Sequence, residues 1–259
     1  YYGADPGNYA TSVSQVITHD AKVCPVCKHR MGYDYYLYNH IGKFHCDHCG
    51  YRSPEAAYKL SKANFSTGEF LLNDLPVKSE FASLYQYMNM TAAAALCAEV
   101  GIPLEKCVEG LNRLKINRTR YEEFTVGGRR GVMILSKNQN PVSFDLSISQ
   151  VLLIKGEKTV VAYINNINHT FHKDTTWLWD ISFERLANEK IHVVCAGPRG
   201  WDLAVRLQYA GFDMSKVHVA TRIKEVGAAV KKTAGTLCVL TELYDAKLIT
   251  GAVAKSYQK

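Results

Sequence analysis

The chain has 259 residues, of which 47% are hydrophobic and 21% are charged, and its formal net charge is +7. This is the profile of a soluble globular protein with room for one large domain or two ordinary ones, and its longest apolar runs are too short to span a bilayer. The positive charge favours an anionic partner, such as nucleic acid, a nucleotide or an acidic membrane surface.

The first twenty residues are polar and irregular, with chain breakers at Gly3, Pro6 and Gly7. The opening Tyr1-Tyr2-Gly3 is nevertheless typical of the end of a strand. Because the first residue is not Met, we expect the chain to begin in the middle of a longer protein.

Two Cys-x-x-Cys pairs dominate residues 21–55. Cys24 and Cys27 form the first pair, and Cys46 and Cys49 form the second. This spacing predicts a zinc ribbon in which four thiolates hold one Zn2+ at about 2.3 Å in a tetrahedron. Since the protein fills every position around the ion, we expect the metal to be structural.

The alternative for these cysteines is a pair of disulfides in a secreted protein. The other four cysteines sit singly in apolar runs and we expect no signal peptide, so a reducing cytoplasm and a metal site are favoured. His29, His40, His45 and His48 crowd the ribbon and are predicted to be surface groups or to lie beside the metal ligands.

After the ribbon the pattern changes from hairpin to helix. Residues 64–80 predict a short hairpin with its turn at Gly68. Residues 81–100, which include four consecutive alanines, predict a helix, and residues 104–114 predict a second one that opens after a proline. Residues 117–120 are typical of a linker.

Beyond this linker apolar strands alternate with amphipathic helices. A hairpin is predicted over residues 122–136, with its turn at Gly127-Gly128. The alternation predicts βαβ units and a mostly parallel sheet with helices on both faces. The strands are predicted at 159–164, 191–196, 217–220 and 236–240, and the helices at 143–152, 181–187, 203–209, 224–231 and 244–255.

Two short motifs between strands and helices favour structural interpretations. No G-x-x-x-x-G-K-[ST] phosphate loop occurs in the sequence. The segment Gly197-Pro198-Arg199-Gly200 could hold an anion at a helix start, but a plain turn is favoured because it does not fit the dinucleotide fingerprint. Cys195 lies near a strand end without the small residue of a G-x-C-x-G elbow, which favours a buried structural thiol.

The segment Asp174–Asp180 carries two carboxylates and two tryptophans directly after a strand, where open α/β sheets place functional loops. The alternative is a surface loop in which Trp177 and Trp179 pack into the core and Asp180 caps the next helix. For Asp180 we favour this alternative, whereas for Asp174 the two interpretations are evenly balanced.

Taken together, motifs from one end of the chain to the other resemble the MurT family, the ligase subunits of lipid II isoglutaminyl synthase and relatives of the Mur ligases. The four-cysteine ribbon and the Trp-Leu-Trp-Asp segment are the specific parts of this resemblance. The other matching segments are Leu84-Tyr-Gln-Tyr-Met-Asn-Met-Thr-Ala-Ala93, Arg120-Tyr-Glu122, Lys137-Asn138 and Asp202-Leu-Ala-Val-Arg-Leu-Gln-Tyr-Ala-Gly211.

The resemblance implies an α/β, Mur-ligase-like fold. Residues 1–116 would be a partial central domain with the four-cysteine zinc ribbon inserted at 21–55, and residues 117–259 a Rossmann-like C-terminal domain. It also implies a cytoplasmic enzyme, peripheral at the inner face of the plasma membrane. Such an enzyme uses ATP and Mg2+ to amidate the D-glutamate α-carboxylate of lipid II, with ammonia from a GatD-like glutaminase partner.

The same resemblance implies roles for individual residues. Asn89 would lie near the adenine, and Arg120 and Lys137 would reach the nucleotide from the C-terminal domain. Asp174 would lend a carboxylate to the cysteine and histidine of the glutaminase, with Asp180 as the second choice. The family's G-T-N-G-K-T loop is absent from this chain, so we expect the chain alone to be inactive.

The sequence departs from the family pattern in two places. Gln86 replaces a family asparagine, and residues 166–172 lack the carboxylates of the family's N-D-x-x-A-D-G.

Two other protein classes remain as alternatives. A zinc-ribbon module for nucleic acid would use the ribbon tyrosines and the net charge, but the mixed charges of the ribbon lead us to expect no nucleic-acid partner. A docking scaffold without catalysis is the other alternative.

Overall fold

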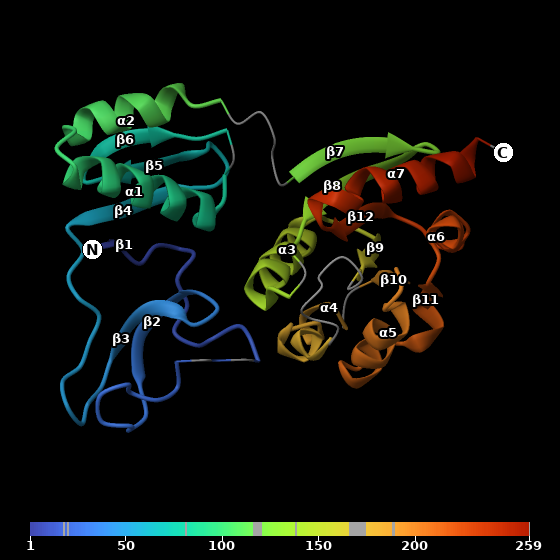
Figure 1. The fold of residues 1–259 in the computed structure, drawn as a ribbon, viewed down its shortest axis with the longest axis horizontal. Coiled ribbons are helices and arrows are strands. Elements are labelled where there is room, and N and C mark those ends of the chain that lie inside the picture. Colours follow the sequence, from blue (N-terminus) through green and yellow to red (C-terminus); the bar gives the residue numbers. More distant parts are fainter. Residues whose placement is uncertain are drawn as a thin grey trace. The chain divides into compact units, whose positions relative to one another are not determined.

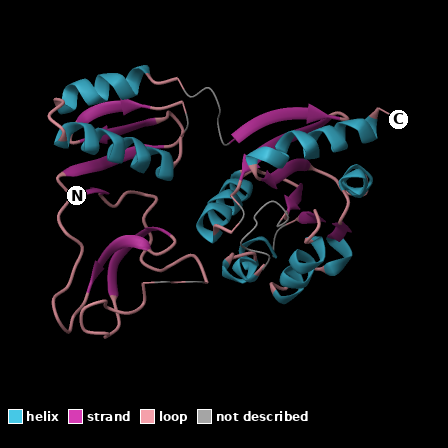
Figure 2. Ribbon diagram, viewed as in Figure 1, coloured by secondary structure: helices cyan, strands magenta, loops and turns pink. Residues whose placement is uncertain are grey.

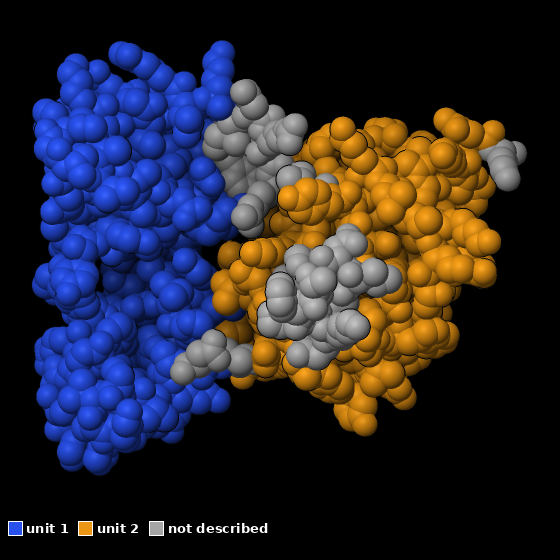
Figure 3. Space-filling view, in the orientation of Figure 1, with its two compact units in different colours: residues 1–15, 19–119 blue, residues 16–18, 120–259 orange. Residues whose placement is uncertain are grey.

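The structure, a computed structural model, describes residues 1–17, 19, 21–80, 82–115, 121–137, 139–165, 175–187 and 190–258. The chain divides into two compact units, one of residues 1–15 with 19–119 and the other of residues 16–18 with 120–259 (Figure 3). Among the described helices, none combines the length and the apolar composition of a membrane span.

A four-stranded sheet supports the first unit (Figure 1). The strand at one edge, which comes first in the chain, pairs in parallel with its neighbour, and the other neighbouring strands are antiparallel. Phe70, Leu72 and Tyr87 lie in the core between this sheet and two helices. In spatial order the strands are β1 (Tyr2–Ala4), β4 (Tyr58–Asn64), β5 (Glu69–Leu72) and β6 (Leu75–Lys78), and the helices are α1 (Leu84–Glu99) and α2 (Leu104–Arg113).

Both helices predicted in this unit are confirmed. α1 begins where the Ser83 side chain accepts a hydrogen bond from the N–H of Gln86. Its buried residues fall on one stripe of helical period, which faces the sheet. These residues are Tyr87, Met90, Thr91, Ala94 and Ala95.

The hairpin predicted over residues 64–80 is an incomplete description. The turn at Gly68 is confirmed, since its φ is +77° and a Cβ there would collide with the carbonyl oxygen of Ser79. A second tight turn at Asn73-Asp74, where both residues have positive φ, adds β6 and makes a three-stranded meander. Because the residues on both sides of this turn are apolar, the sequence pattern predicts one strand where the structure has β5 and β6.

The ribbon is inserted between β1 and β4 of this sheet. Its two strands, β2 (Gly32–Tyr38) and β3 (Ile41–His45), form a separate antiparallel pair. The pair can be followed in Figure 2 below the four-stranded sheet. The chain therefore leaves the sheet after its first strand and returns to pair beside it.

The second unit contains a six-stranded sheet in the order β11-β10-β9-β12-β8-β7. All neighbours are parallel except β7 and β8, which form the hairpin predicted around Gly127-Gly128. The predicted strands and the mostly parallel sheet are thus confirmed. The strands are β7 (Tyr121–Val126), β8 (Arg129–Leu135), β9 (Lys158–Tyr163), β10 (Ile191–Ala196), β11 (Val217–Ala220) and β12 (Thr236–Thr241).

Helices cover both faces of this sheet, as predicted. One core contains α3 (Pro141–Leu153), the short helix η1 (Thr176–Asp180), α4 (Glu184–Ala187) and α5 (Gly200–Tyr209). The other contains α6 (Ile223–Val230) and α7 (Leu243–Tyr257). The single turn η2 (Met214–Lys216) precedes β11.

The helix predicted over residues 181–187 is too long. α4 begins only at Glu184, because the preceding residues are fixed in other ways. Ile181 and Phe183 are buried, and the N–H and hydroxyl of Ser182 donate to the carboxylate of Asp145 at 2.9 and 3.3 Å.

The connections reverse direction between two neighbouring strands. From β8 the chain moves through β9 and β10 to the edge strand β11, with its helices on the first face, and α6 then crosses the second face back to β12. The segments that follow β9 and β12 therefore leave on opposite faces. Open α/β sheets bind ligands at the carboxyl ends of strands at such a switch point.

A buried arginine attaches η1 to α5. Arg206 is 2% exposed, and its Nε and Nη2 donate to the carbonyl oxygens of Leu178 and Ile181 at 3.1 and 2.7 Å. It also pairs with Glu184 at 2.8 Å and lies over the ring of Trp179 at 5.6 Å. One side chain thus adds a charged donor to two carbonyl groups, each of which also accepts a backbone N–H.

We expect Arg206→Met to lower the free energy of unfolding by about 2–4 kcal/mol, because the carbonyl groups of Leu178 and Ile181 lose a charged donor and keep only a backbone N–H. Arg130 is the matched control, since it pairs with Glu123 on the surface, where both side chains are more than half exposed. Arg130→Met should leave stability nearly unchanged. Urea unfolding followed by tryptophan fluorescence measures both variants, and equal losses would contradict this role of Arg206.

Candidate functional site

The four cysteines of the ribbon come together. The Sγ atoms of Cys24, Cys27, Cys46 and Cys49 all lie within 4.8 Å of one another, with Cys24–Cys49 at 3.7 Å and Cys27–Cys46 at 3.5 Å. A tetrahedral ion with Zn–S bonds of about 2.3 Å requires S···S distances of about 3.8 Å. All eight cysteines of the chain are free, which removes the alternative of two disulfides.

The two Cys-x-x-Cys knuckles repeat one backbone pattern. In each, the N–H of the first cysteine donates to the carbonyl five residues later, and its own carbonyl accepts the N–H four residues later. The residue that supplies this N–H has positive φ in both cases, +65° at Lys28 and +75° at Gly50. The four bonds are Cys24 N to His29 O (2.7 Å), Lys28 N to Cys24 O (3.0 Å), Cys46 N to Tyr51 O (2.7 Å) and Gly50 N to Cys46 O (2.9 Å).

The thiols of this cluster do not ionise alike. Burial raises the pKa of Cys24, but N–H groups of Cys27 and Val26 and the neighbouring thiols lower it to about 6. For Cys27 the N–H of His29 lowers the pKa, but burial and the surrounding thiols raise it to about 12. The four cysteines can all be thiolates only beside a cation, and soft sulfur ligands in a tetrahedron suit Zn2+.

The ribbon has almost no core apart from the sulfur atoms. Among the described residues of 21–55, Cys24 and Cys46 are the only ones that are fully buried, at 0% and 2% exposure. Tyr33 and Tyr36 stack at 4.4 Å but remain partly exposed. A segment of this kind depends on its metal for a fixed fold.

The histidines near the cluster lie beside it without being needed as ligands. His29 and His48 are exposed and stack on each other with ring centroids 3.5 Å apart. His45 contacts the carboxylate of Asp34 through Nδ1 at 2.8 Å. His29 and His48 also come within 4.8 Å of the Cys27 sulfur, but the four sulfur atoms are enough for a tetrahedral site.

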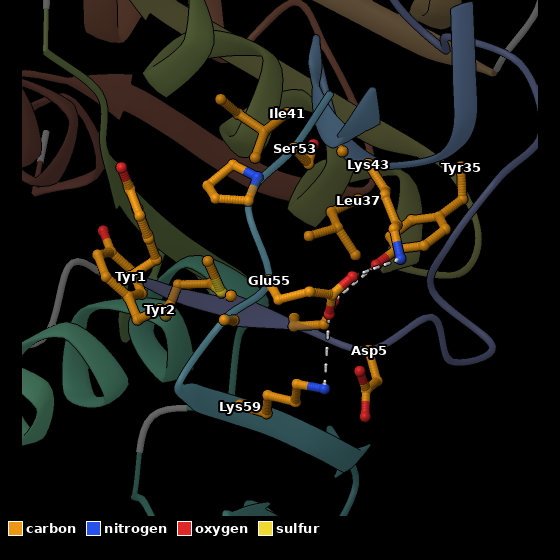
Figure 4. A pocket seen from close by; sticks show the side chains of 16 residues that line it. Tyr1, Tyr2, Asp5, Tyr35, Leu37, Ile41, Lys43, Ser53, Glu55 and Lys59 are labelled. Carbon is orange, nitrogen blue, oxygen red and sulfur yellow. Dashed lines mark hydrogen bonds and ion pairs between the residues drawn. The ribbon is translucent and has the colours of Figure 1, made fainter. Parts of the chain in front are cut away.

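A cavity of about 250 Å³ lies next to the ribbon within the first unit (Figure 4). Glu55 lies between Lys43 and Lys59 in this view, with N–O distances of 3.6 and 4.0 Å. The hydroxyl of Tyr35 donates to the carbonyl oxygen of Ala4 at 3.0 Å. Two lysines and Glu55 in the cavity thus pair with each other, and the cavity lies at the junction between β1 and the ribbon.

At the carboxyl edge of the second unit, Asp174 lies outside the described residues, but the next residue is tied to α5. Thr175 donates its hydroxyl to Asp202 and accepts from Arg199, both at 3.3 Å. Arg199 also binds Asp202 at 2.7 Å, and this guanidinium holds the pKa of the Asp202 carboxyl below its usual value. Residue 175 is thereby fixed at the start of α5.

The rest of this segment differs from the prediction. Trp177 is buried and contacts Phe144, with ring centroids 5.9 Å apart. Trp179 instead remains 47% exposed, because Arg206 and Tyr209 support it at the surface rather than in the core. Asp180 ends η1 and is exposed, four residues before α4, so the expectation that it caps the next helix is wrong.

The predicted nucleotide-binding residues fall in both units. Asn89 is exposed on α1, and Lys137 is exposed directly after β8, at the carboxyl edge of the sheet. Arg120 lies outside the described residues. The positions of Asn89 and Lys137 leave both side chains accessible to a ligand.

The two structural interpretations near β10 agree with the structure. Cys195 is fully buried, and burial raises the pKa of its thiol far above the usual value. Gly197 has a φ of +92°, and a Cβ there would come within 2.6 Å of the carbonyl oxygen of Ile164. This turn is shaped by close backbone packing.

The two knuckles provide a matched test of the metal site. Gly50→Ala should weaken zinc binding about fivefold, because a Cβ at positive φ costs about 1 kcal/mol and nothing else lies within 4 Å. At the equivalent Lys28 a Cβ is already present, so Lys28→Ala should change the affinity little.

Competition with a chromophoric chelator measures both affinities, starting from protein that carries one zinc per chain. Equal weakening by the two substitutions, or purified wild-type protein without zinc, would contradict this description.

The chain is similar in sequence to MurT proteins and in fold to peptide ligases of the Mur type. The family model described as MurT ligase C-terminal matches residues 135–246. A relative from Staphylococcus aureus (strain COL), named lipid II isoglutaminyl synthase (glutamine-hydrolyzing) subunit MurT, is 29% identical over 214 residues. These cover 81% of this chain and 47% of the relative.

The protein of the same name from Streptococcus pneumoniae (strain ATCC BAA-255 / R6) is 25% identical over 230 residues, which cover 87% of this chain and 51% of the relative. The chain thus spans about half the length of the relatives it matches.

Two solved structures show the same fold. A pseudomurein peptide ligase type C from Methanothermus fervidus has a TM-score of 0.69 and 20% identity, covering all of this chain and 53% of that chain. MurF from Acinetobacter baumannii has a TM-score of 0.55 and 17% identity, covering 80% of this chain and 46% of that chain. The chain therefore shares the fold of the Mur ligases, residues 135–246 match the MurT ligase C-terminal family, and most of the chain is similar in sequence to MurT proteins.

Proposed function

We propose that the chain is part of the ligase subunit of a lipid II isoglutaminyl synthase. In this reaction the α-carboxylate of D-glutamate in the lipid II stem peptide is activated with ATP and Mg2+ and converted to an amide by ammonia. The observation that carries the proposal is the match of residues 135–246 to the MurT ligase C-terminal family. The names of the two relatives from Staphylococcus and Streptococcus support it.

The proposal divides the work between the units. Residues 1–116 are part of the central domain and residues 117–259 the C-terminal domain, as the resemblance implies. Asn89 and Lys137, both exposed, and Arg120 would contact ATP. The phosphate-binding loop would belong to a part of the protein that precedes this chain, so the chain alone would not activate a carboxylate.

Zinc has a structural role in this proposal. A Zn2+ held by Cys24, Cys27, Cys46 and Cys49 has no open position for water or substrate. The spacing of the four sulfur atoms supports the assignment, and the lack of any other core in the described ribbon explains why the ion is needed. The metal would therefore support folding and take no part in amidation.

The proposed partner is a GatD-like glutaminase that supplies ammonia. A glutaminase needs a cysteine nucleophile, a histidine base and a group that orients the histidine. We assign the orienting carboxylate to Asp174, as the resemblance implies, and the neighbouring Thr175 is held at the start of α5 by Asp202 and Arg199. The complex would act at the cytoplasmic face of the plasma membrane, where its lipid substrate lies.

We expect Asp174→Asn in the full-length subunit, bound to its glutaminase, to abolish glutamine hydrolysis. Amidation with free ammonium should remain, since the ligase steps do not use this carboxylate. Asp180→Asn is the matched control, because Asp180 is exposed in the same segment, and it should retain both activities.

Steady-state assays of glutamate release and of amidated lipid II measure the two activities separately. Loss of hydrolysis in Asp180→Asn alone would transfer the role to Asp180. Full hydrolysis in both variants would refute a shared triad.

A further inference from the structure

Four buried polar side chains lie around the first turn of α7, at the switch point between β9 and β12. Tyr163, Asn165, Thr241 and Asp245 are exposed by only 6%, 8%, 0% and 6%. The ladder between β9 and β12 ends with Ala162 opposite Leu240, one residue before Tyr163 and Thr241. Both of these side chains therefore point to the face that α7 covers.

No cationic side chain among the described residues forms an ion pair with the carboxylate in this group. Within the described part of the chain, Asp245 receives hydrogen bonds only from Nδ2 of Asn165, at 3.5 and 3.4 Å. Burial and then the charge of Glu242 raise the pKa of Asp245, although the bond from Asn165 lowers it. Buried carboxylates are normally paired with a cation or protonated.

The hydroxyl of Thr241 is a second polar group in this site whose hydrogen bonding is incomplete among the described residues. Its Oγ1 is buried and has no hydrogen-bond partner in the described structure. Buried hydroxyl groups nearly always have a partner, so an orphan one points to a water or ligand that the protein atoms do not include.

Stabilisation of the helix does not account for the whole group. A carboxylate in the first turn of α7 interacts favourably with the partial positive charge of the helix N-terminus. That role would explain an exposed aspartate, but not the depth of Asp245. It also leaves the hydroxyl of Thr241 without a partner among the described residues.

We infer that this group binds ammonium, the nitrogen substrate of the proposed amidation. This inference rests on the proposed function. Ammonium carries four N–H donors and one positive charge. The site offers oxygen acceptors from Asp245, Thr241 and Tyr163, and the Asp245 carboxylate forms no ion pair with a described cation. Asn165 orients the carboxylate through its amide group.

The same site provides a proton acceptor. Ammonium transfers one proton to the Asp245 carboxylate, which becomes a carboxylic acid, and leaves neutral ammonia with its lone pair free to attack a carbonyl carbon. Asn165 directly precedes the segment that ends with Asp174. Nitrogen released by a partner at Asp174 would therefore enter the ligase at this edge of the sheet.

Binding is tested on the chain itself by thermal unfolding at constant ionic strength. Ammonium chloride should raise the midpoint by about 2–4 °C relative to sodium chloride, and Asp245→Asn should abolish the rise. Asp213→Asn is the matched control, because Asp213 is an exposed carboxylate before β11, and it should keep the rise. No rise in the wild type, or an equal rise with potassium chloride, would overturn the assignment.

Kinetics of the full-length subunit with its glutaminase test the role in the reaction. Asp245→Asn should raise the KM for ammonium chloride at least tenfold, with the KM for ATP and the rate of glutamine hydrolysis unchanged. Thr241→Val, which keeps the shape of the side chain, should raise the KM for ammonium chloride severalfold. This second variant tests the site if Asp245→Asn does not fold.

The two claims fail separately. A wild-type complex that forms no amide would refute the proposed function, and thermal unfolding would still decide whether ammonium binds. An active complex whose KM for ammonium is unchanged in both variants would refute the site.

Discussion

Four sulfur atoms hold together a segment that has no other core among its described residues. Because Cys24 and Cys46 are the only fully buried residues described between 21 and 55, the ribbon cannot gain much from hydrophobic burial. Its fold depends instead on one distance constraint, sulfur atoms within 4.8 Å of one another. The ribbon leaves the first sheet after β1 and returns at β4, which pairs in parallel with β1.

The second unit follows a different constraint, the direction of its crossovers. Parallel strands collect their carboxyl ends at one edge, and the reversal between β9 and β12 opens that edge to a ligand. Lys137, Thr175 and the buried group around Asp245 all lie there, although they are far apart in sequence. A ligase that joins an activated carboxylate to ammonia needs such convergence, because the reacting groups must be held together in one geometry.

The sequence predicts regular elements well where one physical rule dominates. The Cys-x-x-Cys spacing places the four sulfur atoms, and the alternation of apolar strands with helices predicts the parallel sheet. It fails where tertiary contacts override a local pattern. Residues 181–183 do not become helical because Asp145 binds the backbone at Ser182, and Trp179 stays at the surface because Arg206 supports it. The pairing of Asn165 with Asp245 joins residues eighty positions apart, and no local signal marks either one.

The central claim, amidation of a glutamate carboxylate, is tested most directly by the fate of nitrogen. Full-length subunit and glutaminase are incubated with lipid II, ATP, Mg2+ and glutamine labelled with 15N in its amide group, and the stem peptide is fragmented in a mass spectrometer. The account predicts one 15N in the stem peptide, as an amide at the α-carboxylate of D-glutamate, only when ATP is present. Unmodified lipid II from a complex that contains zinc and hydrolyses glutamine would contradict it.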